Sequence, residues 1–466
     1  MKIMHRKTIV AADDLPEEHR LKRTLSWPHL IFLGVGAIVG TGILVLIGTA
    51  AGKAGPAMML SFVIAGAICA AAALAYAEVA TMIPASGSAY TYSYVVFGEL
   101  IAWFVGWSLI LEYSLVVSAV SVGWSGYFSP LVGIPQHLAT APALGGMFNF
   151  PAVFIIAVIA GALIYGLKES ANVNSALVAI KMLALAMFVV VALAVFNADN
   201  FHPFMPYGFA KHGPSGSETG VMAAAAIIFF AFYGFDAIAT AAEEAKNPSR
   251  DLAIGIVGSM VLCVLIYMAV AAAAIGAEPY QNFASGADPL AQILRDIGQP
   301  FAAKVLALSA SVGLPTVILA FFYGQSRIFL AMSRDGLLPA RLAQLSGRRN
   351  PVRITLFTAV VVGILAGLVP LNELVALANA GTLTAFIAVS AAMLAMRRTA
   401  PDAQRTFRAP LPWVTGLIGI LGCAYLFYSL PTHTQQWFLL WNSAGLLLYF
   451  IFAARNADRI REPARS

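Results

Sequence analysis

Twelve apolar stretches, each about 20 residues long, follow one another along most of the chain. A run of this length matches the hydrocarbon thickness of a lipid bilayer when it is helical. Only 11% of the 466 residues are charged, against about 25% in soluble domains. The sequence therefore predicts an all-α membrane protein with twelve transmembrane helices. The stretches cover residues 28–52, 56–80, 99–127, 150–167, 174–197, 219–242, 251–275, 302–331, 353–370, 373–396, 411–430 and 435–454.

A polar segment, residues 1–27, precedes the first apolar stretch. A secretory signal peptide would lead from a few basic residues directly into an apolar core, so we expect this segment to remain as a cytoplasmic tail. Lysine and arginine are concentrated in the loops on the same side as this tail, which places both termini, 1–27 and 455–466, in the cytoplasm. Topology and anionic lipid then explain the net charge of +6, and no nucleic-acid partner is needed.

Residues that could support catalysis or metal binding are scarce. Cys69, Cys263 and Cys423 all lie in predicted spans, where we interpret them as small apolar residues. No histidine pair has ligand spacing, and we find no catalytic triple and no phosphate loop. The sequence predicts neither an enzyme nor a metal or cofactor site.

Four glycines interrupt the first span, in FLGVGAIVGTGILVL. Each glycine inside a helix costs about 1 kcal/mol relative to alanine. A dinucleotide fingerprint is excluded, because the spacing is wrong and no βαβ unit surrounds it. Close helix packing through Gly36 and Gly40 remains an alternative, although it gives Thr41 and Gly42 no role.

The functional interpretation is that the first span unwinds around Gly40, Thr41 and Gly42. Unwound backbone at membrane depth must be buried in protein or line a cavity. Free N–H groups at a helix start attract a carboxylate, and free carbonyls at a helix end attract an ammonium group. A zwitterionic α-amino acid carries both charges, so we predict such a ligand.

A second interruption lies in the sixth span, AAAAIIFFAFYGFDAIATAAEEAKNP, where Gly234 and Asp236 stand near the middle. Interrupted spans at matching positions of two halves indicate a transporter built from inverted repeats. We predict a first repeat over 28–197, an inverted second repeat over 219–396, and two additional helices over 411–454. Each repeat then contains five helices.

Four segments carry a resemblance to a known family: GVGAIVGTGILVLIG, YAEVATMIPASGSAYTYSYVVFGELIAWFVGWSLILEY, FFAFYGFDAIATAAEEAKNPSRDL and QSRIFLAMSRDGLLP. They resemble the amino acid, polyamine and organocation (APC) superfamily, and in particular bacterial members of its cationic amino acid transporter branch. The resemblance implies the inverted five-helix repeat, a location in the bacterial inner membrane, and a substrate held between the first and sixth helices.

The resemblance also implies individual contacts. The family's carboxylate contacts fall on the backbone of Thr41 and Gly42, and its amine contacts fall on carbonyls around Ile38, Phe230 and Tyr233. Side-chain walls are expected from span 8, at Val312 and Thr316. Either Phe230 or Phe232 is expected to cover the substrate as an outer gate.

Three ionisable residues lie within predicted spans: Glu112, Lys181 and Asp236. Such groups cost at least about 2.5 kcal/mol at bilayer depth, so each is a functional candidate. Lys181 either extends to the cytoplasmic interface or binds a carbonyl of the unwound first helix. Proton-coupled family members are similar in having a lysine here, which implies proton coupling.

For each intramembrane carboxylate, two interpretations remain open. Asp236 either caps the helix after the second interruption or acts as proton acceptor for Lys181. Glu112 either completes a proton relay or bonds to a neighbouring helix. Glu78, Glu243 and Glu244, at the inner ends of spans 2 and 6, are expected to be gate or interface charges.

These observations together predict a secondary transporter that carries L-amino acids inward with a proton by alternating access. Its partners would be the amino acid, protons and membrane lipid. Obligate exchange of amino acids, or of an amino acid for a polyamine, is the first alternative, and a non-transporting membrane subunit is the second. We expect broad or neutral side-chain specificity.

Overall fold

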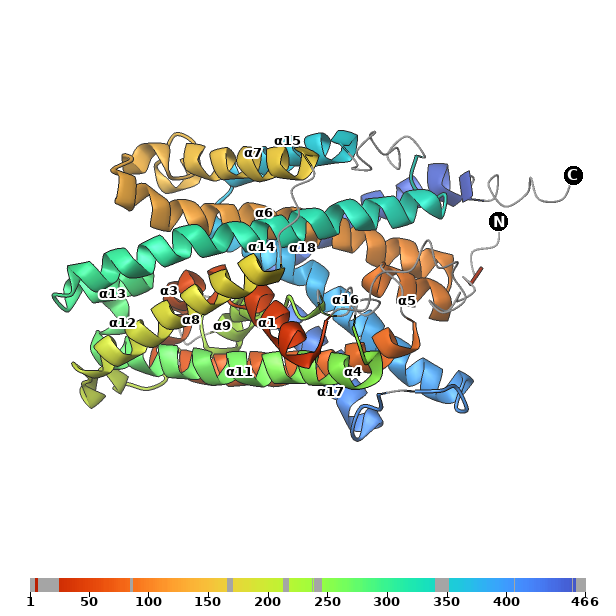
Figure 1. Cartoon of the computed structure of the whole chain (residues 1–466), viewed down its shortest axis with the longest axis horizontal. Helices are drawn as coiled ribbons and strands as arrows, with labels where there is room; N and C mark the ends of the chain where they lie inside the picture. Colours follow the sequence, from red (N-terminus) through yellow and green to blue (C-terminus); the bar gives the residue numbers. More distant parts are fainter. Residues whose placement is uncertain are drawn as a thin grey trace, which may run out of the picture.

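The computed structural model describes residues 5–6, 25–83, 87–165, 171–212, 218–236, 238, 245–339, 352–405, 407–454 and 456–457. Within this part of the chain the regular structure is helical, as predicted (Figure 1). Among the described residues, an isolated β-bridge joins Leu25 and Ala245.

Eight helical segments are long and apolar enough to cross a membrane, and four shorter apolar helices accompany them. Most of their ends lie within a few residues of the predicted stretches, but the helices that begin the first and sixth stretches end early, at Ile38 and Ala231. The long segments contain α3 (Leu46–Ala54) with α4 (Met58–Met82), α6 (Glu99–Val132), α8 (Ala171–Leu193), α11 (Pro248–Ala277), α14 (Pro300–Arg334), α16 (Leu371–Thr399), α17 (Pro412–Ser429) and α18 (Thr432–Leu448). The shorter ones are α1 (Trp27–Ile38), α7 (Phe150–Tyr165), α9 (Val221–Ile228) with its 3-10 extension η7 (Phe229–Ala231), and α15 (Val352–Leu368).

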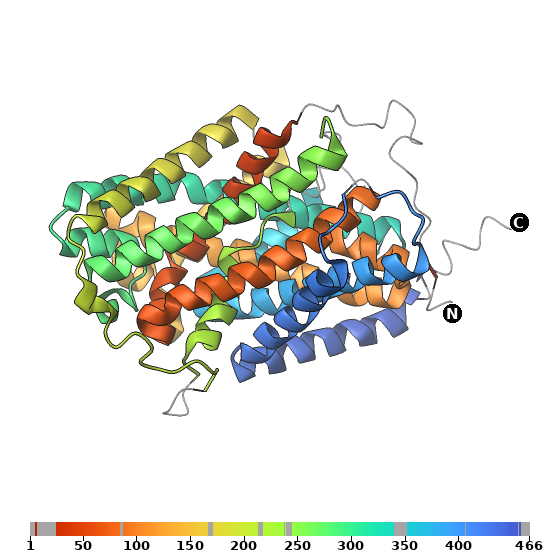
Figure 2. The same ribbon diagram turned by 90° about the horizontal axis from the view of Figure 1, so that it is seen from below.

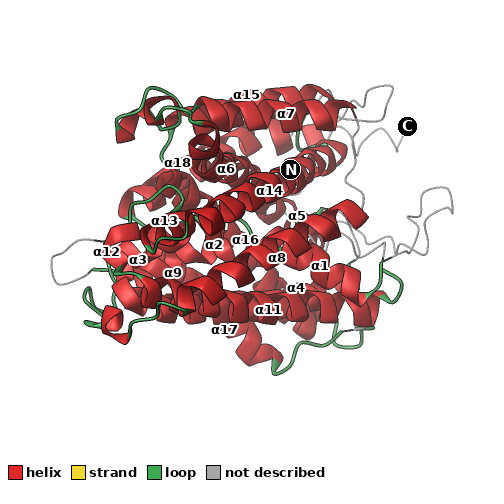
Figure 3. Ribbon diagram, turned by 60° about the vertical axis from the view of Figure 1, so that its left-hand side comes forward, coloured by secondary structure: helices red, strands yellow, loops and turns green. Residues whose placement is uncertain are grey.

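The long helices α14 and α16 each pack against α6 in the middle of the bundle. On one side, α7 and α15 form a pair along the edge (Figures 1 and 3). On the other side, α4 and α11 pack together, and the last two helices, coloured blue, run along an edge of their own (Figure 2). The short helices α1, α2 (Thr41–Leu44), α3 and α9 lie between these layers, so both predicted interruptions are enclosed by protein.

The exposed fraction of the side chains distinguishes the outer helices from the central ones. Most residues of α6 are buried, whereas Val190 of α8 and Phe154 of α7 are 70% and 59% exposed. A helix that is apolar all round can face lipid on one side and protein on the other. The segment between α11 and α14 contains two short helices, α12 (Tyr280–Phe283) and α13 (Pro289–Asp296), and Leu290 of α13 is fully buried.

Glu78, near the C-terminal end of α4, is buried and pairs with two arginines. Arg397 donates two hydrogen bonds of 2.6 Å to its carboxylate, and Arg405 donates one of 3.2 Å. The backbone N–H of Ala409 donates a further bond of 2.8 Å. Glu78 is thus an interface charge joining α4 to α16 and the segment after it, while Glu243 and Glu244 lie outside the described residues.

We expect Glu78→Gln to destabilise the fold, because Arg405, whose side chain is 2% exposed, and the nearby Arg397 would lose their counter-charge. Removing one partner of a buried ion pair costs about 3–5 kcal/mol. Thermal unfolding in detergent should show the loss as a clearly lower midpoint. Glu373→Gln, at the start of α16 and outside this cluster, is the control; equal midpoints for the two variants would contradict the expectation.

Candidate functional site

The first interruption separates α1 from α2. Helix α1 ends at Ile38, where Val39 is extended, with φ −76° and ψ 96°. Gly40 follows at φ −152° and ψ −141°, and helical geometry resumes at Thr41. A helix end leaves its last carbonyls and its first N–H groups without partners inside the helix. The break therefore places free carbonyls before Gly40 and free N–H groups after it, as predicted.

The second interruption follows α9. A single 3-10 turn continues to Ala231, and Gly234 then adopts φ +117°. Glycine tolerates this conformation, whereas residues with a side chain rarely adopt it. Helical geometry returns at Asp236. Both spans are thus broken close to the positions that the sequence indicated.

The two interruptions touch each other. A Cβ atom added at Gly42 would lie 2.3 Å from the Cα of Ala231, and one added at Gly234 would lie 2.9 Å from the carbonyl oxygen of Ala37. At Gly40 the nearest atom, in Val317, would be 3.4 Å away. Close packing therefore depends on Gly42, a residue to which the packing interpretation gave no role, while Gly40 belongs to the unwound chain.

Lys181 of α8 binds the free carbonyl end of α1. Its Nζ donates hydrogen bonds of 2.9 Å to the carbonyl oxygens of both Gly36 and Val39. Its side chain is only 2% exposed and lies against Gly313 of α14. The interpretation in which Lys181 extends to the interface is therefore wrong, and its predicted position at the unwound helix is confirmed.

Two further donors bind carbonyls at the breaks. The hydroxyl of Tyr267, on α11, donates a bond of 2.9 Å to the carbonyl of Ile38. The thiol of Cys69, on α4, donates one of 3.4 Å to the carbonyl of Phe232. The sequence indicated neither role, and Cys69 was interpreted as merely apolar. Helices α4, α8 and α11 thus all hold the unwound segments through side-chain donors.

Of the two intramembrane carboxylates, Glu112 lies on α6 and Asp236, after the second break, bonds to α6. Asp236 accepts a hydrogen bond of 3.0 Å from the hydroxyl of Tyr113. Glu112, the preceding residue, lies against Gly381 of α16. It is 2% exposed, and its Oε2 has no hydrogen-bond partner. Thr382 lies beside both the Glu112 carboxyl and the Tyr233 hydroxyl.

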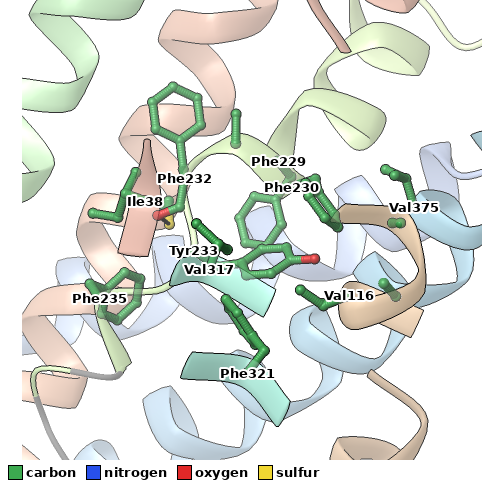
Figure 4. Packing of buried hydrophobic residues seen from close by; sticks show 14 of the residues in the cluster. Ile38, Val116, Phe229, Phe230, Phe232, Tyr233, Phe235, Val317, Phe321 and Val375 are labelled. Atoms are coloured by element: carbon green, nitrogen blue, oxygen red, sulfur yellow. Dashed lines mark hydrogen bonds between the residues drawn. The ribbon is translucent and has the colours of Figure 1, made fainter. Parts of the chain in front are cut away.

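Aromatic and aliphatic side chains surround the breaks (Figure 4). The rings of Phe230 and Tyr233 lie 5.0 Å apart, and Phe321 of α14 packs on Tyr233 at 6.3 Å. Val116 of α6 and Val317 of α14 complete this part of the cluster. The surroundings of the Phe230 and Tyr233 rings therefore include several apolar side chains from spans 3 and 8.

Two predicted contacts need correction. Phe232 is fully buried against Phe62 and Tyr267, on the side of α4 and α11, so it cannot cover the centre as a gate. Val312 is 45% exposed on the outer surface of α14, because the helix is rotated so that Val317 faces Gly40. Thr316 is buried, with its hydroxyl bonded to the carbonyl of Gly313. Phe230 is 6% exposed and packs on Tyr233 beside the second break.

Several buried polar atoms at the centre have no partner. Among the described residues these include Thr41 Oγ1, Tyr233 OH, Glu112 Oε2 and Asn379 Oδ1. An unsatisfied buried polar group costs about 1–3 kcal/mol, so these four atoms are candidates for contact with a ligand. In the same part of the chain, no group of three or more His, Cys, Asp or Glu side chains is placed to hold a metal.

A cavity of about 190 Å³ lies beside the junction of α2 and α3, one helical turn after Thr41. Val45 and Gly126 contribute to its walls. Thr49 donates a hydrogen bond of 2.9 Å to Asn372 across this region.

A membrane-embedded bundle with two touching broken helices is the architecture of a small-molecule transporter. Residues 25–452 match the amino acid permease family. The chain belongs to this family, within the APC superfamily. It is a multi-pass membrane transporter and not an enzyme.

Individual relatives cover nearly the whole chain. It is 43% identical over 451 residues to the branched-chain amino acid permease BcaP of Bacillus subtilis (strain 168), which covers 94% of this chain and 95% of the relative. It is 40% identical over 446 residues to the methylthioribose transporter of the same organism, with the same coverage. It is 36% identical over 421 residues to the vacuolar cationic amino acid transporter 2 of Arabidopsis thaliana, covering 88% of this chain and 64% of the relative.

Proposed function

We propose that this permease is a proton-coupled symporter that carries neutral L-amino acids inward by alternating access. Its twelve spans would form two inverted repeats, 28–197 and 219–396, followed by the helices of 411–454. Both termini would lie in the cytoplasm and the protein in a bacterial inner membrane. The observation that carries the proposal is the pair of hydrogen bonds from Lys181 to the carbonyl end of α1.

The substrate would lie between the two breaks. Its carboxylate fits the free N–H groups of Thr41 and Gly42, beside the unpaired hydroxyl of Thr41. Its ammonium group fits the carbonyls of Ile38, Phe230 and Tyr233. The Ile38 carbonyl already accepts from Tyr267, but a carbonyl oxygen has a second lone pair and can accept again.

Proton coupling would act through Lys181. A charged ammonium group can donate to two carbonyls of α1 at once, so its protonation favours the arrangement in which α1 is held against α8. Loss of the proton weakens that attachment and frees α1 to move. Substrate and proton are coupled if both favour the same state. Asp236 and Glu112 would receive or deliver the proton.

Side-chain selection would favour branched aliphatic substrates. The walls recorded around Tyr233 are Phe230, Phe321, Val116 and Val317, which suit an apolar side chain. The name of the Bacillus subtilis BcaP relative points to the same class. A methylthioribose ligand has neither the carboxylate nor the ammonium group that the two breaks match.

The decisive experiment is uptake of labelled leucine into liposomes containing the purified protein. We expect an inward proton gradient to drive accumulation, and we expect isoleucine and valine to compete better than lysine or arginine. Accumulation without any proton dependence, together with efficient counterflow, would support the exchanger instead. Absence of leucine binding and transport would overturn the proposal.

Two alanine substitutions should distinguish a phenylalanine that contacts the substrate from one that only stabilises the fold. Phe230→Ala removes a ring beside Tyr233, so we expect a raised KM for leucine with a modest loss of stability. Phe232→Ala empties a fully buried site, which costs about 3–5 kcal/mol. Uptake kinetics and thermal unfolding measure the two effects, and a raised KM confined to Phe232→Ala would reverse the assignment.

A further inference from the structure

Asn379 of α16 binds the end of α9, just before the second interruption. Its Nδ2 donates hydrogen bonds of 2.8 and 3.1 Å to the carbonyl oxygens of Ala226 and Ile227. Helix α9 ends at Ile228, and the last carbonyls of a helix have no partner inside it. Asn379 is fully buried, so its amide supplies the partner that water cannot.

This arrangement repeats the one at the first interruption, where Lys181 of α8 donates to two carbonyls at the end of α1. Lys181 is the eighth residue of the fifth predicted stretch, 174–197, and Asn379 is the seventh residue of the tenth, 373–396. In the proposed inverted repeats the fifth and tenth stretches are equivalent, as are the first and the sixth. The last helix of each repeat therefore holds the broken helix of the same repeat through one nitrogen and two carbonyls.

The two nitrogens differ in their chemistry. The ammonium group of a lysine can lose a proton, whereas the amide of an asparagine does not titrate and remains a donor at every pH. Titratable side chains lie around both donors, on α6, on α11 and after the second break: Glu112, Tyr233, Asp236, Cys263 and Tyr267. Of the two equivalent nitrogens, Lys181 alone can respond directly to a proton.

Helix α16 also supports the second break beyond α9. Thr382 is three residues from Asn379 and so lies on the same helical face, and it lies beside the Tyr233 hydroxyl. The ring of Phe229 packs on Phe386 of α16, with 5.7 Å between the ring centroids. The carbonyls proposed to receive the substrate's ammonium group therefore belong to a segment that α16 fixes on both sides.

We propose that Asn379 is the non-titrating counterpart of Lys181, a positioning residue that holds α9 on α16 at every pH. The proton on Lys181 then controls α1 alone, and one of the two breaks responds to the gradient while the other keeps its geometry. This inference rests on the proposed function, in which Lys181 is the coupling group and the two repeats are inverted copies. It adds that the two halves of the substrate site have different tasks.

Asn379→Asp tests this assignment, because a carboxyl group of nearly the same shape can donate to a carbonyl only while it is protonated. The measurement is hydrogen–deuterium exchange of the full-length protein in detergent, in acidic and in alkaline buffer, corrected for the chemical exchange rate. Such exchange reports local opening of a helix. In the wild type we expect pH to alter the exchange of residues 27–42 and to leave that of residues 221–231 unchanged.

The variants should change the second segment in distinct ways. In Asn379→Asp, exchange of residues 221–231 should rise several-fold in alkaline buffer and return to the wild-type level in acidic buffer. Asn379→Leu, which cannot donate at any pH, should show the rise in both buffers. Asn442→Asp is the matched control, because Asn442 is a buried asparagine of α18 whose amide donates to the carbonyl of Phe438. It should leave residues 221–231 as in the wild type.

Wild-type exchange of residues 221–231 in both Asn379 variants would overturn the proposal. So would a wild type in which these residues respond to pH as strongly as residues 27–42. Leucine affinity is a readout that packing alone would not move, and in Asn379→Asp it should fall several-fold in alkaline buffer only. A wild type that binds no leucine would overturn the proposed function, while the exchange, measured without substrate, would still decide whether Asn379 holds α9 at every pH.

Discussion

Lys181→Ala is expected to abolish accumulation of leucine driven by an inward proton gradient. The substitution removes the group that donates to the carbonyls of both Gly36 and Val39. Without this group, α1 has no proton-dependent attachment to α8. The proton gradient then cannot favour either the outward-facing or the inward-facing state. The measurement is uptake into liposomes with and without the gradient, and the expected loss is to the level of protein-free liposomes.

A structural defect could mimic this result, because two carbonyls would lose a partner at about 1–3 kcal/mol each. Lys181→Gln separates the two explanations, since its amide can still donate a hydrogen bond but cannot titrate. We expect Lys181→Gln to keep leucine counterflow and to lose the response to pH. Lys304→Ala, at an exposed site on α14, is the control for loss of positive charge. Undiminished gradient-driven uptake by Lys181→Ala would show that Lys181 is not needed for proton coupling.

The features predictable from sequence are those that depend on composition within one span. Helix positions follow from the length of each apolar run, because bilayer thickness imposes that length. The two breaks follow from Gly40 and Gly234, since glycine weakens a helix wherever it stands. Lys181 is recognisable because a charge in an apolar run is costly enough to need a specific partner.

The features that the sequence did not predict depend on how helices are rotated against each other. Helix α14 is apolar on all sides, so nothing in its pattern indicated that Val317, and not Val312, faces the centre. Consecutive aromatics in an unwound segment have no helical period, which is why the sequence could not decide between Phe230 and Phe232 as the gate. The bonds from Cys69 and Tyr267 join residues far apart in sequence, and only the packing of α4 and α11 creates them.

The second large effect is expected from a substitution at the contact between the two breaks. A single methyl group added by Gly42→Ala would lie 2.3 Å from the Cα of Ala231, well inside van der Waals contact. Backbone on both sides must move apart, at a cost of about 1–3 kcal/mol. Because the proposed carboxylate and ammonium contacts come from these two segments, we expect leucine binding to be lost and uptake to fall by more than about tenfold.

The same substitution elsewhere provides the control. Gly161→Ala adds a methyl group to a membrane helix where nothing lies within 4 Å, so transport should stay at the wild-type level. Leucine binding is measured by scintillation proximity, and size-exclusion chromatography verifies that both variants are folded. Wild-type affinity in a folded Gly42→Ala protein would show that the substrate does not bind between the breaks. Lost binding in that variant alone would instead locate the amino acid where the two interrupted helices meet.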